Sequence, residues 1–567
     1  MGRAITTRRT IMGPSKKSPN TRPGYDRRRF LKAGVTGGAF IAALPFIRGR
    51  DEPAIAQTPS QAVSSFDLEE ITIVELSEGM QSGKLTARSI AEKYLARIKE
   101  IDQNGPSINS IIELNPDALA IADELDQERK TKGPRGPMHG IPVLIKDNID
   151  TADHMSTTAG SLALAGSKPP ADAFLVQQLR RAGAVILGKT NLSEWANIRS
   201  SHSTSGWSGR GGLTKNPYAL DRNTSGSSSG SAAAVSANLC TVAVGTETDG
   251  SIVSPSSING LVGIKPTVGL ISRTGVIPIS HTQDTPGPMG RTVSDAVILL
   301  GALTGVDAGD KASAASKGHH FSDYTQYLHP KGLHGARIGV VRTYFGFHEA
   351  VDILMEEAIT VLKKEGAVII DPVETKVFTE LGNAEDTVLQ FELKADMNSY
   401  LARLGPNAPA RTLKDLIEFN KNHKQTEMPY FGQDIFIKAE ARGPLTSKLY
   451  IEALEKCRRL MRKEGIDTVM KKHKLDALVA PTDSPAWLTD LVDGDHFLGG
   501  SSTAAAVAGY PSITVPAGFI HGLPVGISFF GRAWSEPKLI GLAYSFEQAT
   551  KIRKSPRFLP TVDVHNG

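Results

Sequence analysis

Short apolar segments alternate with amphipathic segments along most of this 567-residue chain, and this alternation limits the folds open to it. Apolar runs of four to six residues next to Gly or Pro read as buried strands, and longer runs with apolar residues three and four apart read as helices. The predicted strands are 142–145, 184–187, 242–244, 337–341, 367–370, 475–480 and 525–530, and the predicted helices are 86–101, 174–181 and 351–365. Strands alternating with helices predict an α/β fold with helices on both faces of the sheet.

The chain after residue 65 contains no low-complexity linker, internal repeat or block of charge. The composition of the whole chain, 40% hydrophobic and 22% charged, is typical of soluble globular proteins and unlike disordered, collagen-like or multi-span membrane proteins. We therefore expect one large domain over 57–567. The more polar segment 307–442 is a candidate for substrate-specific elaboration of that domain, although ordinary surface helix explains its composition equally well.

Cysteine and histidine show no pattern typical of a metal site. The two cysteines belong to no CxxC pair, which leaves open only a single disulfide between them, and the histidines lie in separate segments without an HExxH motif. The sequence therefore predicts neither a bound metal nor a dense disulfide framework. The residues concerned are Cys240, Cys457, His139, His154, His202 and His281.

The first 56 residues carry most of the basic charge of the chain. They contain twelve Lys or Arg and three acidic residues, so the remainder has a net charge of −4 although the whole chain has +5. Arg27 and Arg28 precede a Gly- and Ala-rich apolar run at 33–47, and the small residues Ala54 and Ala56 follow it. The apolar run is about half the roughly 20 residues that span a bilayer.

This order resembles a twin-arginine export signal, with cleavage after Ala56. It implies recognition by the twin-arginine export machinery, a periplasmic or extracellular protein, and no stable membrane anchor after cleavage. A basic tail that binds nucleic acid or anionic lipid is the alternative, but such a tail has no need of an apolar run and a cleavage pattern after its arginines. Met12 remains a candidate start, and we expect no nucleic-acid partner for the mature chain.

A Gly- and Ser-rich segment at 223–234 (NTSGSSSGSAAA) leads directly into an apolar stretch. A flexible linker would not adjoin a core element in this way, so we expect a tight loop at the start of a buried helix. No Gly-Lys-Ser/Thr follows the loop, which argues against a phosphate-binding site.

Two further segments carry residues suited to nucleophilic catalysis. Gly250 precedes Ser251 in GTETDGSI, where a sharp turn could bring backbone N–H groups together as an oxyanion hole. Lys146 ends the apolar strand in HGIPVLIKDN. A lysine buried there would lose proton affinity and could act as a general base.

Together these segments resemble the amidase signature family, whose hydrolases use a Ser–cis-Ser–Lys triad. The similarity continues through GLVGIKPTVGL, QDTPGPMGRTV, PSITVPAGF and GLPVGISFFG, and it covers essentially all of the chain after the export segment. It implies a single large α/β domain with a mixed sheet. It also implies a reaction that needs no metal or organic cofactor.

The resemblance assigns a role to each matching residue. Ser251 matches the nucleophile, Ser227 the bridging cis-serine and Lys146 the base, with Ser228 and Ser229 as competitors for the bridging role. The oxyanion donors implied by the match are the N–H groups of Thr248, Asp249, Gly250 and Ser251. The chain departs from the common pattern at Glu247, Asp249 and Val253, where many members have Asp, Gly and Arg, and at Ser229, where glycine is common.

We expect mainly structural roles for the remaining residues that the sequence singles out. Asp284 and Arg291 match family positions and are expected to be buried or to fix loops. Thr292 is expected to cap the helix that follows it. Trp195 and Trp207 could line a substrate pocket or pack in the core.

We therefore expect an exported amidohydrolase that cleaves carboxamide C–N bonds outside the peptide backbone through an acyl-Ser251 intermediate. The segments GTETDGSI and FELKAD (391–396) look closest to peptide amidase-like members, which remove the C-terminal amide of peptides. The substrate would thus be a peptide or small-molecule amide. Acyl or aryl amide hydrolysis, the transamidating subunit of a tRNA-dependent amidotransferase, and a non-catalytic binding protein remain as alternatives.

N-terminal sequencing of protein recovered outside the cytoplasm tests the export interpretation. We expect the mature chain to begin at Gln57 and to focus on the acidic side of neutrality, because cleavage removes a segment with a net charge of +9. A mature chain beginning at Met1 or Met12 would contradict this prediction.

Overall fold

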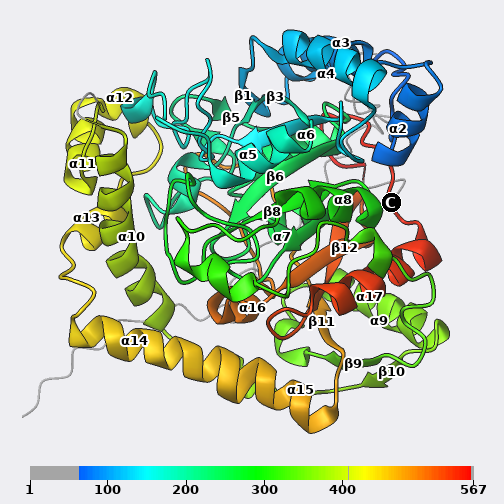
Figure 1. Cartoon of the computed structure of the whole chain (residues 1–567). Coiled ribbons are helices and arrows are strands. Elements are labelled where there is room, and N and C mark those ends of the chain that lie inside the picture. Colours follow the sequence, from blue (N-terminus) through cyan, green and yellow to red (C-terminus); the bar gives the residue numbers. More distant parts are fainter. Residues whose placement is uncertain (1–62, 406–407, 564–567) are drawn as a thin grey trace, which may run out of the picture. The chain divides into compact units, whose positions relative to one another are not determined.

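A mixed sheet of eleven strands forms the centre of the fold (Figure 1). The computed structural model describes residues 63–405 and 408–563, so the expected signal at 1–56 and its boundary lie outside the described residues. The strand order is β1-β3-β2-β6-β8-β7-β12-β13-β11-β9-β10, and β4 and β5 form a separate hairpin. The strands are β1 Ile111–Leu114, β2 Pro142–Lys146, β3 Val185–Thr190, β4 Trp207–Ser208, β5 Gly212–Leu213, β6 Val242–Glu247, β7 Val262–Lys265, β8 Thr285–Gly290, β9 Arg337–Val340, β10 Val368–Ile370, β11 Ala477–Pro481, β12 Ser512–Ile520 and β13 Leu523–Phe530.

Strand directions place the ends of β2 and β6 together. Strand β2 runs parallel to both β3 and β6, whereas β8, β7, β12 and β13 continue the sheet in antiparallel fashion. The carboxyl ends of parallel neighbours meet at one edge of a sheet. Lys146 at the end of β2 therefore lies near Thr246 and Glu247 at the end of β6.

Within the described residues, sixteen α-helices accompany the sheet. They are α2 Ile73–Gln81, α3 Ala87–Arg97, α4 Ala118–Lys132, α5 Phe174–Arg181, α6 Ser229–Ser236, α7 Val253–Ile258, α8 Val293–Leu303, α9 Glu349–Lys364, α10 Ala384–Arg403, α11 Leu413–Asn422, α12 Lys424–Glu427, α13 Asp434–Glu440, α14 Lys448–Arg458, α15 Asp467–His473, α16 Ser502–Ala508 and α17 Glu536–Thr550. Two π-helical segments, η1 Ile98–Gln103 and η8 Arg459–Ile466, extend α3 and join α14 to α15.

Helices cover both faces of the sheet, as predicted. The register of β7 and β8 makes Gly263 and Gly290 point to opposite faces. A Cβ atom on Gly263 would meet Ser256 of α7 at 2.3 Å, and one on Gly290 would meet Ala296 of α8 at 3.1 Å. Glycine at these positions thus lets α7 and α8 pack closely on the two faces.

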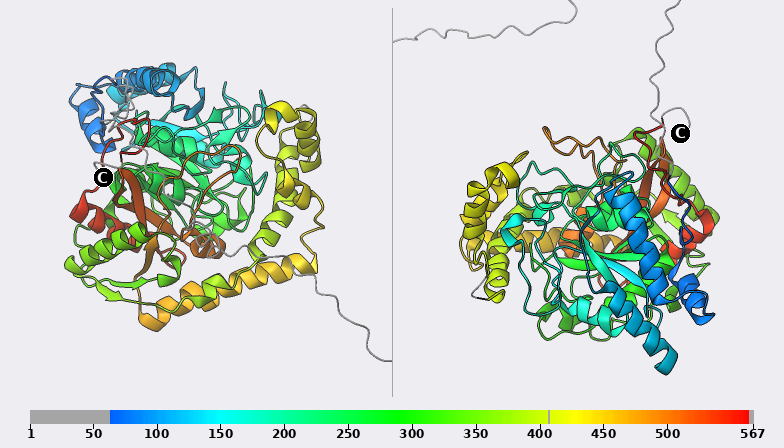
Figure 2. Two further views of the ribbon diagram at one scale, coloured as in Figure 1. Left: turned by 180° about the vertical axis from the view of Figure 1, so that it is seen from behind. Right: turned by 90° about the horizontal axis from the view of Figure 1, so that it is seen from above.

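The second part of the polar segment 307–442 forms a helical group beside the sheet, whereas its first part contributes β9, α9 and β10. Helices α10 to α13, yellow in Figures 1 and 2, stand together there. Leu393 of α10, Leu416 of α11 and Phe436 of α13 share one apolar cluster with Trp195. This group therefore packs against the segment that follows β3.

The predicted elements are present, with small shifts at their ends. Helix α5 has the predicted bounds, whereas the helix predicted over 86–101 ends as an α-helix at Arg97 and continues as η1. Strands β3 and β6 run three residues further than predicted. These extra residues are partly polar, so the apolar pattern ended before the strands did.

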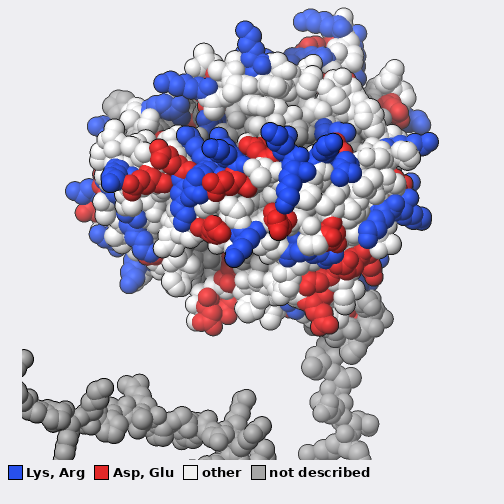
Figure 3. All heavy atoms as spheres, turned by 90° about the horizontal axis from the view of Figure 1, so that it is seen from below, with Lys and Arg blue, Asp and Glu red and all other residues white. Residues whose placement is uncertain are grey.

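Opposite charges are mixed on the face that includes the bottom of Figure 1, where α14 and α15 lie (Figure 3). Lys448 lies 3.5 Å from Glu452, and Arg459 lies 2.8 Å from Glu464. Exposed pairs of this kind contribute little to stability. On the described part of this face, acidic groups lie between the basic ones (Figure 3).

Two further findings concern the described residues alone. Cys240 and Cys457 are both buried free thiols, so the disulfide left open by the sequence is not formed. Among residues 63–405 and 408–563, no helix combines the length and apolar character needed to cross a bilayer.

Thr292 caps α8, as predicted, and its hydroxyl can be tested. It accepts a hydrogen bond from the Asp295 N–H at 3.0 Å and donates to the Asp295 carboxylate at 2.8 Å. Thr292→Ala should lower the free energy of unfolding by about 1 kcal/mol, because it leaves a helix N–H without its partner. Urea unfolding measures this loss, and Thr292→Ser should restore most of it; equal midpoints for all three proteins would contradict the assignment.

Candidate active site

Lys146 is a fully buried lysine whose amine, among the described residues, forms hydrogen bonds with hydroxyl and carbonyl groups only. Its Nζ lies 2.8 Å from Ser227 Oγ and 3.1 Å from Ser228 Oγ. It also lies 2.9 Å from Thr246 Oγ1 and 3.2 Å from the Thr246 carbonyl oxygen. Neighbours of this kind solvate an amine without requiring it to carry a charge.

Burial controls the protonation of this lysine. It lowers the pKa of Lys146 to about 7, while the carboxylates of Glu247 and Asp284 act in the opposite direction and limit the fall. A large fraction of Lys146 is therefore neutral near pH 7, where an exposed lysine is almost fully charged. Neutral Lys146 has a lone pair with which to accept a proton from Ser227.

The three consecutive serines before and at the start of α6 have different surroundings. Ser228 is tied to β6, since its hydroxyl donates to the Thr246 carbonyl at 3.1 Å and accepts from the Thr246 N–H at 3.2 Å. Ser229 donates to the Ser225 carbonyl at 2.6 Å. Ser227 follows a cis peptide bond from Gly226, and within the described chain its hydroxyl contacts Lys146 alone. Of the three, Ser227 is the best placed to pass a proton onward.

Ser251 lies in the loop between β6 and α7, beside the Ser227 segment. The Ser228 N–H donates to the Ser251 carbonyl at 3.3 Å, which joins the two loops. In residues 63–405 and 408–563 the Ser251 hydroxyl has no hydrogen-bond partner, and the residue is 9% exposed. Gly250 before it has φ +81°, a conformation that residues with a Cβ rarely adopt.

Backbone donors converge in the same loop. The N–H groups of Asp249, Gly250 and Ser251 donate to no acceptor in the part of the chain that the structure describes. Consecutive free N–H groups in a tight turn form a site for a negatively charged oxygen. The Thr248 N–H likewise donates to no acceptor within the described residues, so all four predicted oxyanion donors are available beside Ser251.

Glu247 and Asp249, two acidic residues at which the chain differs from the common family pattern, fix the loop that bears Ser251. Glu247 accepts hydrogen bonds from the N–H groups of Ile252 at 2.7 Å and Val253 at 3.0 Å. The Asp249 carboxylate accepts from Ser502 at 2.5 Å and Thr503 at 2.7 Å at the start of α16. Sequence reasoning identified both acids as unusual but not their role in fixing the turn.

Two residues near Lys146 were not predicted. Thr246 Oγ1 contacts Lys146 and accepts a hydrogen bond from Asn148 Nδ2 at 3.0 Å. Both residues lie in motifs already quoted, so the parallel pairing of β2 and β6 could have indicated them. Their polar groups position the Lys146 amine at the sheet edge.

The other predicted residues have structural roles. Asp284 accepts from Thr248 Oγ1 at 2.6 Å and from the Ile279 and Ser280 N–H groups, so it fixes a loop. Arg291 is buried and donates to the Cys240 carbonyl at 2.8 Å.

The two tryptophans are core residues. Trp195 packs edge-on against Phe436, and Trp207 packs in the same way against Phe431. Both are buried, at 2% and 6% exposure, which favours the packing interpretation of each side chain.

The four histidines considered as metal ligands are dispersed. His139 is buried against the Leu125 carbonyl, at 3.0 Å from its Nε2, and His154 pairs with Asp117. His202 contacts the Ser201 hydroxyl at 3.0 Å. Only His281 joins a group of acids, Glu392 and Asp396, within the described residues.

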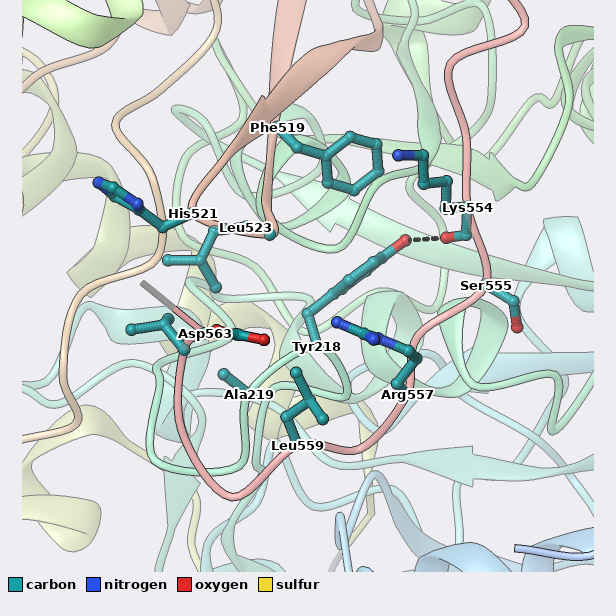
Figure 4. Close-up of a pocket in the computed structure, with 12 residues that line it drawn as sticks. Tyr218, Ala219, Phe519, His521, Leu523, Lys554, Ser555, Arg557, Leu559 and Asp563 are labelled. Atoms are coloured by element: carbon teal, nitrogen blue, oxygen red, sulfur yellow. Dashed lines mark hydrogen bonds between the residues drawn. The ribbon is translucent and has the colours of Figure 1, made fainter. Parts of the chain in front are cut away.

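A cavity of about 440 Å³ lies away from the candidate catalytic residues. It is found where the C-terminal segment passes the β12–β13 hairpin (Figure 4). Tyr218 and Phe519 form part of its wall, and the Tyr218 hydroxyl donates to the Lys554 carbonyl at 2.6 Å. None of Lys146, Ser227 and Ser251 lines it.

Comparisons with known proteins agree with this geometry. The family model described as Amidase matches residues 89–540. The crystal structure of native peptide amidase from Stenotrophomonas maltophilia is 51% identical, with a TM-score of 0.83, and the match covers 87% of this chain and 100% of that one. A probable amidase from Arabidopsis thaliana is 44% identical over 505 residues, which are 88% of this chain and 93% of the relative.

A third relative is named for a different activity. A glutamyl-tRNA(Gln) amidotransferase subunit from Halorhodospira halophila is 32% identical over 493 residues, covering 85% of this chain and 98% of that protein. The family match spans most of the chain and includes the Lys146, Ser227 and Ser251 segments. The chain therefore belongs to the amidase family and is a hydrolase that acts on amide C–N bonds.

Proposed function

We propose that this amidase hydrolyses carboxamides through an acyl-Ser251 intermediate, with Ser227 as bridging residue and Lys146 as base. The observation that carries the proposal is the contact of 2.8 Å between the buried Lys146 amine and Ser227 Oγ, beside the loop that bears Ser251. A serine hydroxyl becomes an effective nucleophile only when a base removes its proton. Lys146 and Ser227 supply that base and the path to it.

The proton moves in both directions along this path. As Ser251 Oγ attacks the amide carbon, its proton passes to Ser227 Oγ while Ser227 gives its own proton to Lys146 Nζ. The protonated Lys146 then returns a proton through Ser227 to the departing nitrogen, because an amine leaves only when protonated. Water attacks the Ser251 ester by the same route and releases the carboxylic acid.

The free backbone donors account for stabilisation of the oxyanion. The N–H groups at 249–251, with that of Thr248, would donate to the carbonyl oxygen as it becomes negative. Loss of one such donor typically slows acyl transfer by about 10²–10³-fold. Glu247 and Asp249 keep these donors in place through the hydrogen bonds that fix the turn.

We propose the C-terminal amide of peptides as the substrate class and export as the route to it. The 51% identity to the peptide amidase of Stenotrophomonas maltophilia supports the substrate, since it greatly exceeds the 32% identity to the amidotransferase protein. The arginine pair, apolar run and Ala-x-Ala order at 27–56 support export. Acyl and aryl amides remain the alternative substrates.

A panel of amides tests the proposal. Purified enzyme is assayed for release of ammonia or amine from an N-acylated dipeptide amide, a fatty acyl amide, an anilide, and glutamine with glutamyl-tRNA and ATP. We expect ammonia chiefly from the dipeptide amide. We expect Ser251→Ala to lower kcat by about 10⁴–10⁶-fold, as loss of a nucleophile does in other serine hydrolases.

Matched serine variants make the test specific. Ser256 is buried in α7 and its hydroxyl has no hydrogen-bond partner in the described chain, so Ser256→Ala should retain activity. Ser227→Ala should lose far more activity than Ser228→Ala. Wild-type protein that hydrolyses none of the amides, or full activity in Ser251→Ala, would overturn the proposal.

A further inference from the structure

Helix α10 presents three acidic side chains toward the active-site loops. Glu385, Glu392 and Asp396 are seven and four residues apart, which places them on one face of the helix. Glu392 and Asp396 belong to the FELKAD segment noted in the sequence, and the proposed reaction assigns no role to either. All three accept hydrogen bonds from the loop 279–284. The donors are Gln283 for Glu385, Thr282 for Glu392 and His281 for Asp396.

Glu392 is the buried centre of these contacts. Its side chain is fully buried, and one carboxylate oxygen accepts hydrogen bonds from the Ser280 hydroxyl and from the Thr282 N–H and Oγ1, the last two at 3.1 and 3.0 Å. The other oxygen accepts from the Tyr450 hydroxyl at 2.6 Å. Because both oxygens already have partners from the protein, Glu392 acts here as an acceptor for loop 279–284 and α14.

Asp396 binds His281, which lies between Ser280 and Thr282 in the same loop. It accepts from the His281 N–H at 2.9 Å and lies 2.9 Å from His281 Nδ1. The other ring nitrogen of His281 lies 3.4 Å from Glu392. These carboxylates raise the pKa of His281, although burial opposes them, and His281 thus bridges two acids one helical turn apart.

Gln283 and Asp284, at the end of loop 279–284, bind Thr248 in the proposed oxyanion segment 248–251. The Asp284 carboxylate accepts from Thr248 Oγ1 at 2.6 Å, and Gln283 Nε2 donates to the Thr248 carbonyl at 3.3 Å. Gln283 Nε2 also donates to Glu385 at 2.9 Å, so Gln283 connects Thr248 to helix α10. Thr248 is therefore held from both its side chain and its carbonyl by loop 279–284.

We propose that Glu392 and Asp396 are positioning residues for catalysis: through loop 279–284 they fix Thr248 and hence the direction of the oxyanion donors. This inference rests on the proposed function, because it gives these acids a role only if the segment 248–251 binds the oxyanion. Neither acid touches the reacting atoms. Catalysis is sensitive to such support, since a displacement of about 1 Å in a catalytic group can cost about 10²-fold in rate.

The test replaces each carboxylate by its amide and separates kcat from KM. Glu392→Gln and Asp396→Asn should lower kcat on the dipeptide amide by about 10- to 100-fold and leave KM within about threefold, because the oxyanion forms only in the transition state. Asp386→Asn, on the same helix but exposed, is the matched control and should keep wild-type kcat. His281→Asn provides a milder variant at a partly exposed site should Glu392→Gln fail to fold.

A double-mutant cycle tests whether the effect passes through Thr248. Thr248→Val removes the hydroxyl that donates to Asp284, so Asp396→Asn should have little further effect on kcat in that background. Wild-type kcat in Glu392→Gln and Asp396→Asn, purely additive effects in the cycle, or a loss confined to KM would each overturn the inference. Failure of the proposed function is distinguishable, because the wild-type enzyme would then hydrolyse no amide.

Discussion

The burial of one lysine at the edge of the sheet is the constraint on which the active site depends. An isolated buried ammonium group is costly, and a lysine without water or a paired carboxylate tends to lose its proton. Here β2 and β6 end side by side, so Lys146 meets the hydroxyl and carbonyl of Thr246 and the hydroxyl of Ser227. Glu247 and Asp284 are close enough to keep its pKa from falling below about 7. The fold thereby produces an amine that can accept a proton near neutral pH, as the proposed base must.

Much of this arrangement follows from local sequence pattern. Apolar runs indicated β2, β6 and β13, and the family motifs singled out Lys146, Ser227 and Ser251. Contacts between distant segments could not be predicted, because they depend on how the helices pack after the sheet forms. Asp249 is an example: its partners Ser502 and Thr503 lie more than 250 residues away, and nothing in the local sequence connects them. The hydrogen bonds of Glu247, Glu392 and Asp396 likewise became evident only in the folded chain, and the roles that we propose for these acids rest on them.

The helical group α10 to α13 is more than a cover for the sheet. It shares an apolar cluster with Trp195, and α10 also directs its acidic face toward loop 279–284. The helical group, which we expect to vary with substrate, is thus connected to the segment that carries the proposed oxyanion donors. This connection gives a physical reason why changes in the helical group could alter turnover as well as binding.

Direct titration of Lys146 tests the account most sharply. Protein with lysine labelled at ¹³Cε can be followed by NMR against pH, with Lys146→Met to assign the signal. A second variant, Lys265→Met, identifies another buried lysine whose pKa burial lowers to about 8. We predict that Lys146 titrates near pH 7, and that Glu247→Gln moves this value down because it removes a nearby negative charge. A Lys146 signal that titrates near 10.4, as in an exposed lysine, would contradict its role as a neutral base.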